Sequence, residues 1–107
     1  MTVIGATLLP FAGAASYHPD RAEEADRIAV NRWIRGACHF DGVVDLDTAA
    51  RDSAAPDHLR PAYDSGDHLH PSPAGYRALG QAVAAVIATM PNGVRRTACP
   101  PITGGAG

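Results

Sequence analysis

The first hydrophobic segment of the sequence is a short apolar run near its amino-terminal end. Residues Val3–Leu9 are rich in β-formers, and Pro10 closes the run because proline has no backbone N–H to donate. A continuous apolar run of this length is typical of a strand that is buried on both faces. It predicts an interior strand of a parallel sheet.

The next segment has the spacing of an amphipathic helix, predicted over residues 20–35. Acidic residues in its first turn and arginines near its end suit the helix dipole. Glu23 stands four residues before Arg27, and both are predicted on the solvent face. The predicted buried stripe consists of apolar residues at three- and four-residue spacing, namely Ala22, Ala25, Ile28, Ala29 and Trp33.

A second β-type run, residues 42–47, follows this helix, so that residues 3–47 read as strand, helix, strand. Two parallel strands joined by a right-handed crossover are the expected arrangement. Residues 48–66 show no periodicity and predict a long surface loop. The expected fold class is α/β, as part of a flavodoxin-like three-layer α/β/α sandwich whose amino-terminal half is missing.

A last helix is predicted to begin at Ser72-Pro73, which is a good N-cap and first-turn pair, and to extend to about Met90. Residues 91–107 have no apolar period and predict a disordered tail, so that residues 1–90 hold the domain portion. The predicted buried face of the last helix is formed by Tyr76, Leu79, Val83, Val86 and Ile87.

Composition and charge narrow the classes of function. The chain has 107 residues, enough for one small domain, and a net charge of −2, so it lacks the basic surplus that nucleic-acid binding requires. No apolar run is long enough to span a membrane. Residues 2–15 resemble the apolar core of a secretory signal, but they lack a basic start, and a buried strand is the preferred interpretation. Whether Cys38 and Cys99 pair stays open.

Candidate chemistry is concentrated in residues 64–71, Asp-Ser-Gly-Asp-His-Leu-His-Pro. A carboxylate three residues before a histidine in a turn can accept the imidazole Nδ1–H and leave Nε2 free to take a proton from a nucleophile. Asp67 and His70 have this spacing. They are the candidate catalytic residues, and the bland alternative is that His70 is a solvated loop histidine beside an aspartate.

A metal site is a rival interpretation of the same segment. His68 and His70 form a His-x-His pair, to which Asp67 or Asp64 adds an oxygen ligand and His58 or His39 a more distant nitrogen. Alternate residues share a face only on an extended strand, which Pro71 and Ser65-Gly66 disfavour. We therefore expect no metal and no cofactor.

The segment Tyr63–Tyr76 closely resembles the last conserved block of SGNH/GDSL-type serine ester hydrolases. Gly5–Phe11, Asn31–Arg35 and Phe40–Asp47 resemble the family's late strand, the following helix and the final strand. The resemblance implies an esterase or lipase with a Ser-His-Asp triad, whose acid falls on Asp67 and whose base falls on His70. It makes His68 a spacer residue, and it implies an ester of a small molecule, a lipid or a sugar as substrate.

One departure from the family is large. The nucleophilic serine of the family lies in a Gly-Asp-Ser motif, which none of the chain's four serines provides, and the oxyanion-hole blocks are also missing; the serines are Ser16, Ser53, Ser65 and Ser72. The chain is therefore expected to hold only the Asp/His part of the triad and to be close to inactive alone. The alternative is a non-catalytic fragment or pseudoenzyme that needs a partner to complete its sheet. Many relatives are exported, but the compartment of this protein stays open.

Overall fold

The computed structural model describes residues 1–15, 20–36 and 39–90. The predicted tail, His18, Ser16 and both cysteines lie outside these residues. In chain order the elements are β1 (Ile4–Ala6), α1 (Arg21–Arg35), β2 (Gly42–Val44), α2 (Leu46–Ala50), the 3₁₀ helix η1 (Pro61–Tyr63) and α3 (Pro73–Ala88).

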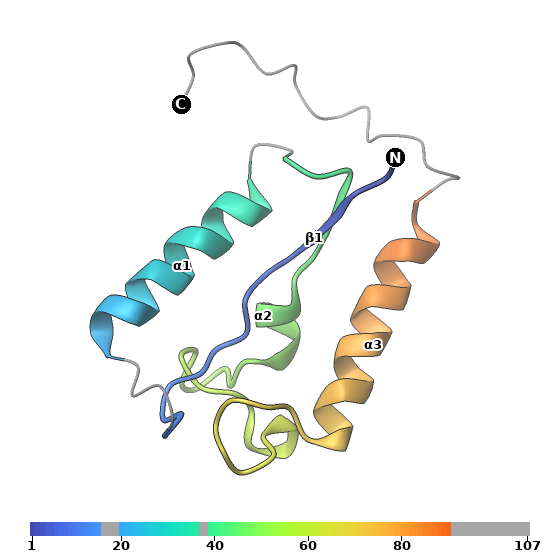
Figure 1. Cartoon of the computed structure of the whole chain (residues 1–107). Coiled ribbons are helices and arrows are strands. Elements are labelled where there is room, and N and C mark those ends of the chain that lie inside the picture. Colours follow the sequence, from blue (N-terminus) through green and yellow to red (C-terminus); the bar gives the residue numbers. More distant parts are fainter. Residues whose placement is uncertain (16–19, 37–38, 91–107) are drawn as a thin grey trace.

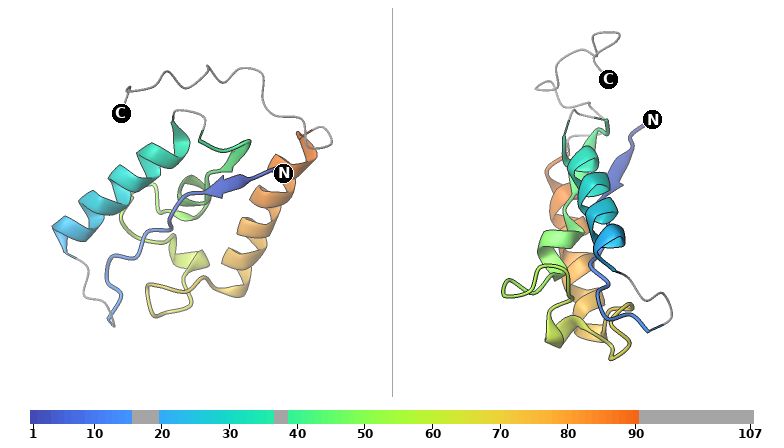
Figure 2. Two further views of the ribbon diagram at one scale, coloured as in Figure 1. Left: turned by 45° about the horizontal axis from the view of Figure 1, so that its top comes forward. Right: turned by 90° about the vertical axis from the view of Figure 1, so that its left-hand side faces the viewer.

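The two strands pair in parallel, as the sequence predicts, with Ile4 opposite Gly42 and Ala6 opposite Val44. Figure 1 shows α1 and α3 on opposite sides of the strands, and the left-hand view of Figure 2 shows the same order from another direction. Two parallel strands with helices on both sides are part of a flavodoxin-like α/β domain.

β1 is shorter and more exposed than the sequence predicts. Val3 and Leu8 flank the strand and are 44% and 47% exposed. The prediction of an interior strand buried on both faces is wrong. Within the described residues β1 pairs with β2 alone, and along the strand Ile4 is half-buried, Gly5 buried and Ala6 exposed.

The bounds of α1 agree with the prediction, and its caps explain them. The Asp20 side chain accepts from the backbone N–H groups of Ala22 and Glu23, and the Glu23 carboxylate accepts from the Asp20 N–H in return. This capping box satisfies donors that the first turn would otherwise leave unpaired. Gly36 is the C-cap, and its N–H donates to the carbonyl of Arg32.

The face of α1 that is buried is the opposite of the predicted one. Arg27, Asn31 and Ile34 are buried, whereas Ile28 and Trp33 of the predicted stripe are exposed. The prediction failed because two of the three buried residues, Arg27 and Asn31, bind polar groups of other segments. Asn31 closes two hydrogen bonds with Leu8, accepting from its N–H (2.6 Å) and donating to its carbonyl (2.9 Å).

Arg27 extends this polar contact to α2. Its guanidinium donates to Asp47 Oδ1 (2.7 Å), to the carbonyls of Leu8 and Pro56, and to Glu24. Arg27 and Asp47 are each 3% exposed, and no buried side-chain nitrogen or oxygen of the described residues lacks a partner. The desolvation cost of the buried charges is therefore offset by complete pairing.

Residues 48–66 contain more structure than the predicted loop. β2 ends at Val44 because Asp45 caps α2, where its side chain accepts from the N–H of Thr48. Arg51 and Leu59 form an antiparallel bridge, and η1 follows. The predicted strand over residues 42–47 is accordingly too long at its carboxyl end.

α3 begins at the predicted cap, since Ser72 Oγ accepts from the N–H of Gly75. Leu79, Val83 and Val86 are half-buried, but Tyr76 and Ile87 of the predicted face are more than half exposed. No helix in the described part of the chain is long and apolar enough to cross a membrane.

The two glycines of α3 provide a matched test of this packing. An added Cβ at Gly75 would lie 2.6 Å from the Tyr63 carbonyl oxygen, whereas nothing lies within 4 Å of one at Gly80. We predict that Gly75→Ala lowers the free energy of unfolding by about 1–3 kcal/mol through overpacking. Gly80→Ala should raise it by about 0.5–1 kcal/mol because alanine favours a helix interior. Urea unfolding measures both, and equal effects would contradict the described contact.

Candidate active site

The candidate residues lie on a loop that joins η1 to α3. Its base is closed by an antiparallel bridge between Asp64 and Pro71 and by hydrogen bonds from the Ser65 N–H to the His70 carbonyl (3.0 Å) and from the Ser72 N–H to the Tyr63 carbonyl (2.8 Å). Figure 1 shows this loop at the end of the molecule toward which both strands run. Ligand sites of α/β sheets lie at the carboxyl ends of the strands.

Asp67 and His70 form the hydrogen-bonded pair that their spacing predicts. His70 Nδ1 lies 2.5 Å from Asp67 Oδ2. Asp67 Oδ1 accepts from the backbone N–H groups of Leu69 (2.9 Å) and His70 (2.8 Å) and from the hydroxyl of Ser65 (3.0 Å). Both carboxylate oxygens are thus held by the loop itself.

The electrostatics of this pair favour an ionised acid. The hydrogen bond from His70, followed by those from the backbone N–H groups of His70 and Leu69, holds the pKa of Asp67 well below its usual range. An ionised Asp67 places the imidazole proton on Nδ1 and leaves Nε2 as an acceptor. The His70 side chain is 65% exposed, so Nε2 is accessible from outside the loop.

A second aspartate–histidine pair lies in the same loop, and sequence reasoning missed it. Asp64 Oδ2 lies 2.6 Å from His68 Nδ1, and Oδ1 accepts from the N–H groups of Gly66 (2.8 Å) and His68 (3.0 Å). Burial raises the pKa of Asp64, but these bonds outweigh it and lower the pKa overall. The sequence did offer one indication of this second pair, because two carboxylates and two histidines fall within seven residues.

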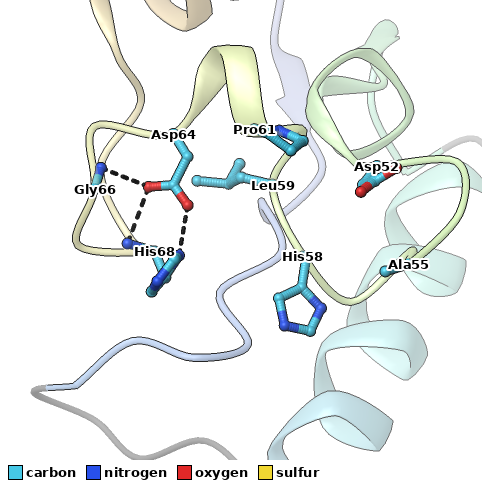
Figure 3. Close-up of a pocket in the computed structure, with 8 residues that line it drawn as sticks. All are labelled: Asp52, Ala55, His58, Leu59, Pro61, Asp64, Gly66 and His68. Carbon is cyan, nitrogen blue, oxygen red and sulfur yellow. Dashed lines mark hydrogen bonds and ion pairs between the residues drawn. The ribbon is translucent and has the colours of Figure 1, made fainter.

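A pocket of about 430 Å³ lies beside His68 (Figure 3). His58, which also lines it, has its Nδ1 2.8 Å from Asp57 Oδ1. His70 is not among the lining residues, which are Asp52, Ala55, His58, Leu59, Pro61, Asp64, Gly66 and His68.

Two of the three serines in the described part of the chain use their hydroxyls in local hydrogen bonds and not in a contact with His70. Ser65 donates to Asp67, and Ser72 caps α3 while its hydroxyl donates to the Ala62 carbonyl (2.8 Å). Ser53 is exposed in the segment that follows α2. Within the described residues, no serine hydroxyl is hydrogen-bonded to His70.

The rival metal set is not assembled. His68 and His70 each turn Nδ1 to a different carboxylate, and His39 stacks on Trp33 with ring centroids 3.9 Å apart. Among residues 1–15, 20–36 and 39–90, no group of three or more His, Cys, Asp or Glu side chains has an arrangement that could hold a metal ion.

Comparison with known protein families agrees with the resemblance given above for the segment Tyr63–Tyr76. Residues 1–78 match the GDSL-like Lipase/Acylhydrolase family, a region that includes both strands, α1 and the loop with Asp67 and His70. No curated protein matches the chain. Because the match covers well over half of the sequence, the chain belongs to the GDSL-like lipase/acylhydrolase family, whose members are ester hydrolases.

Proposed function

We propose that this chain provides the acid and the base of a Ser-His-Asp ester hydrolase, with Asp67 as the acid and His70 as the general base. The observation that carries the proposal is the 2.5 Å contact between Asp67 Oδ2 and His70 Nδ1, inside the segment that matches the family. The exposed imidazole and the ionised carboxylate support it.

The reaction then follows the usual two stages of acyl transfer. His70 Nε2 takes the proton of the serine hydroxyl while the serine oxygen attacks the ester carbonyl carbon. The tetrahedral intermediate collapses when His70 returns that proton to the leaving alcohol, which breaks the ester bond and leaves an acyl-enzyme. A water molecule then attacks the acyl carbon while His70 takes its proton. His70 returns that proton to the serine oxygen as the acyl–serine bond breaks, which releases the carboxylic acid and restores the serine. Asp67 stays ionised and stabilises the imidazolium in both stages.

The nucleophile in this proposal comes from a segment other than residues 1–107. The hydroxyls of Ser65 and Ser72 are committed to the loop and to the helix cap, and no serine of the chain follows Gly-Asp. We call the assembly of this chain with a segment carrying the Gly-Asp-Ser strand the completed enzyme. Acyl lipids, short-chain esters and acetylated sugars all fit the proposed chemistry.

A non-catalytic fragment that needs a partner to complete its sheet is the second candidate, and the lack of a Gly-Asp-Ser motif in residues 1–107 favours it. Ile28 and Trp33 on α1 and Val3 and Leu8 beside β1 are 44–54% exposed, and an added segment could cover them in either candidate. The two candidates differ in one observation: addition of a Gly-Asp-Ser segment should generate esterase activity in the first and none in the second.

Replacement of the base provides the first test of the proposal. In the completed enzyme, His70→Ala should lower kcat by about 10⁴-fold or more, because no other group accepts the serine proton. His68→Ala is the comparison and should lower kcat by less than about tenfold, since His68 takes no part in proton transfer and can act only through the shape of the loop. Hydrolysis of p-nitrophenyl acetate measures both, and equal losses would refute the assignment of His70.

Replacement of the acid tests the role of Asp67 in setting the tautomer. In Asp67→Asn the Oδ1 atom still accepts from Leu69 and His70, but the side-chain NH₂ now faces Nδ1 and forces the proton onto Nε2. We expect an unchanged thermal unfolding midpoint and a loss of kcat of about 10³–10⁴-fold. Unaltered turnover would remove Asp67 from the mechanism.

A further inference from the structure

We infer that Asp64 and His68 are positioning residues that hold Asp67 and His70 in their reactive geometry, an inference that rests on the proposed function. The two aspartate–histidine pairs overlap in sequence, since Asp67 lies between Asp64 and His68. Each pair joins Oδ2 to Nδ1 and uses Oδ1 for backbone N–H groups. The two pairs therefore share the backbone of residues 64–70.

The Asp64 carboxylate is suited to positioning rather than to chemistry. Its side chain is 11% exposed, against 49% for Asp67, and three donors from Gly66 and His68 use both of its oxygens. It lies at the base of the loop, where its backbone forms the bridge to Pro71. Asp64 thus connects the base of the loop to the turn at its tip.

The backbone of His68 needs this support. Its φ of +62° lies in the left-handed region, and it is the one described non-glycine residue with a positive φ. A side chain in that region costs about 1–2 kcal/mol. The bonds from the His68 N–H and Nδ1 to Asp64 offset this cost and hold the reversal that turns His70 back toward Asp67.

The His68 ring also connects the loop to the chain that follows β1. A Cβ built on Gly13 would lie 3.4 Å from Cγ and Cδ2 of His68, so the ring lies directly over that glycine. The same segment is hydrogen-bonded to the chain between α2 and η1, since the Ala12 N–H donates to the Asp57 carbonyl (3.0 Å). The His68 ring thus lies beside the segment that follows β1.

The test is nitrogen NMR of the imidazoles in the full chain, because the fraction of His70 that carries its proton on Nδ1 reports the geometry without needing turnover. The wild-type chain, at a pH where His70 is neutral, should show mainly the Nδ1–H form. Asp64→Asn and His68→Gly should lower that fraction about twofold or more as the loop loosens. His68→Asn should restore most of it, since asparagine tolerates the left-handed region and can donate to Asp64.

Asp57→Asn is the matched control, because it breaks the Asp57–His58 pair, which lies outside the loop of residues 64–71. It should leave the His70 signals unchanged, and an equal response to Asp57→Asn and Asp64→Asn would overturn the inference. Unchanged His70 signals in Asp64→Asn and His68→Gly would also overturn it, while leaving the proposed function intact. A wild-type His70 without the Nδ1–H form would refute the proposed function itself. Should Asp64→Asn unfold, His68→Gly decides, since its φ suits glycine.

Discussion

The buried ion pair between Arg27 and Asp47 is the interaction on which the rest of the structure depends. It joins the middle of α1 to the first turn of α2, and the same guanidinium binds the carbonyls of Leu8 and Pro56. Four segments that are distant in sequence therefore meet at one side chain. Each partner also has a second counter-ion, since Asp47 Oδ2 accepts from Arg35 (2.8 Å) and Arg51 (3.3 Å) and Arg27 pairs with Glu24. Loss of one partner would therefore remove this junction between the segments without leaving the other charge unpaired.

The contacts of Arg27 and Asn31 also position the two segments that lead to the candidate site. Arg27 and Asn31 hold the chain at Leu8, and a few residues later Gly13 lies under the His68 ring. On the other side, Pro56 leads into the segment that ends at Tyr63. The Tyr63 carbonyl faces Gly75 and accepts from the Ser72 N–H, which closes the loop of residues 64–71. The contacts of Arg27 and Asn31 on the inner face of α1 thus help to position the loop that carries Asp67 and His70.

Local features of this protein could be predicted from the sequence, and long-range polar contacts could not. The helix bounds follow from Asp20, Gly36 and Ser72, and the Asp67–His70 pair follows from spacing, because each depends on neighbours a few residues away. The inverted face of α1 could not be predicted, since the partners of Asn31 are backbone atoms 23 residues distant, and hydrophobic periodicity ignores them. The Asp64–His68 pair could not be predicted because it goes with a left-handed backbone conformation at His68, which its sequence neighbours do not indicate.

The central claim is that this chain supplies a base and its orienting acid for a serine that another segment provides. The most direct measurement is treatment of the completed enzyme with a fluorophosphonate, followed by intact mass of each component. The account predicts one stoichiometric adduct on the Gly-Asp-Ser segment and none on this chain. A stoichiometric adduct on any of the four serines of this chain would contradict the account, because the nucleophile would then lie on the same chain as its base.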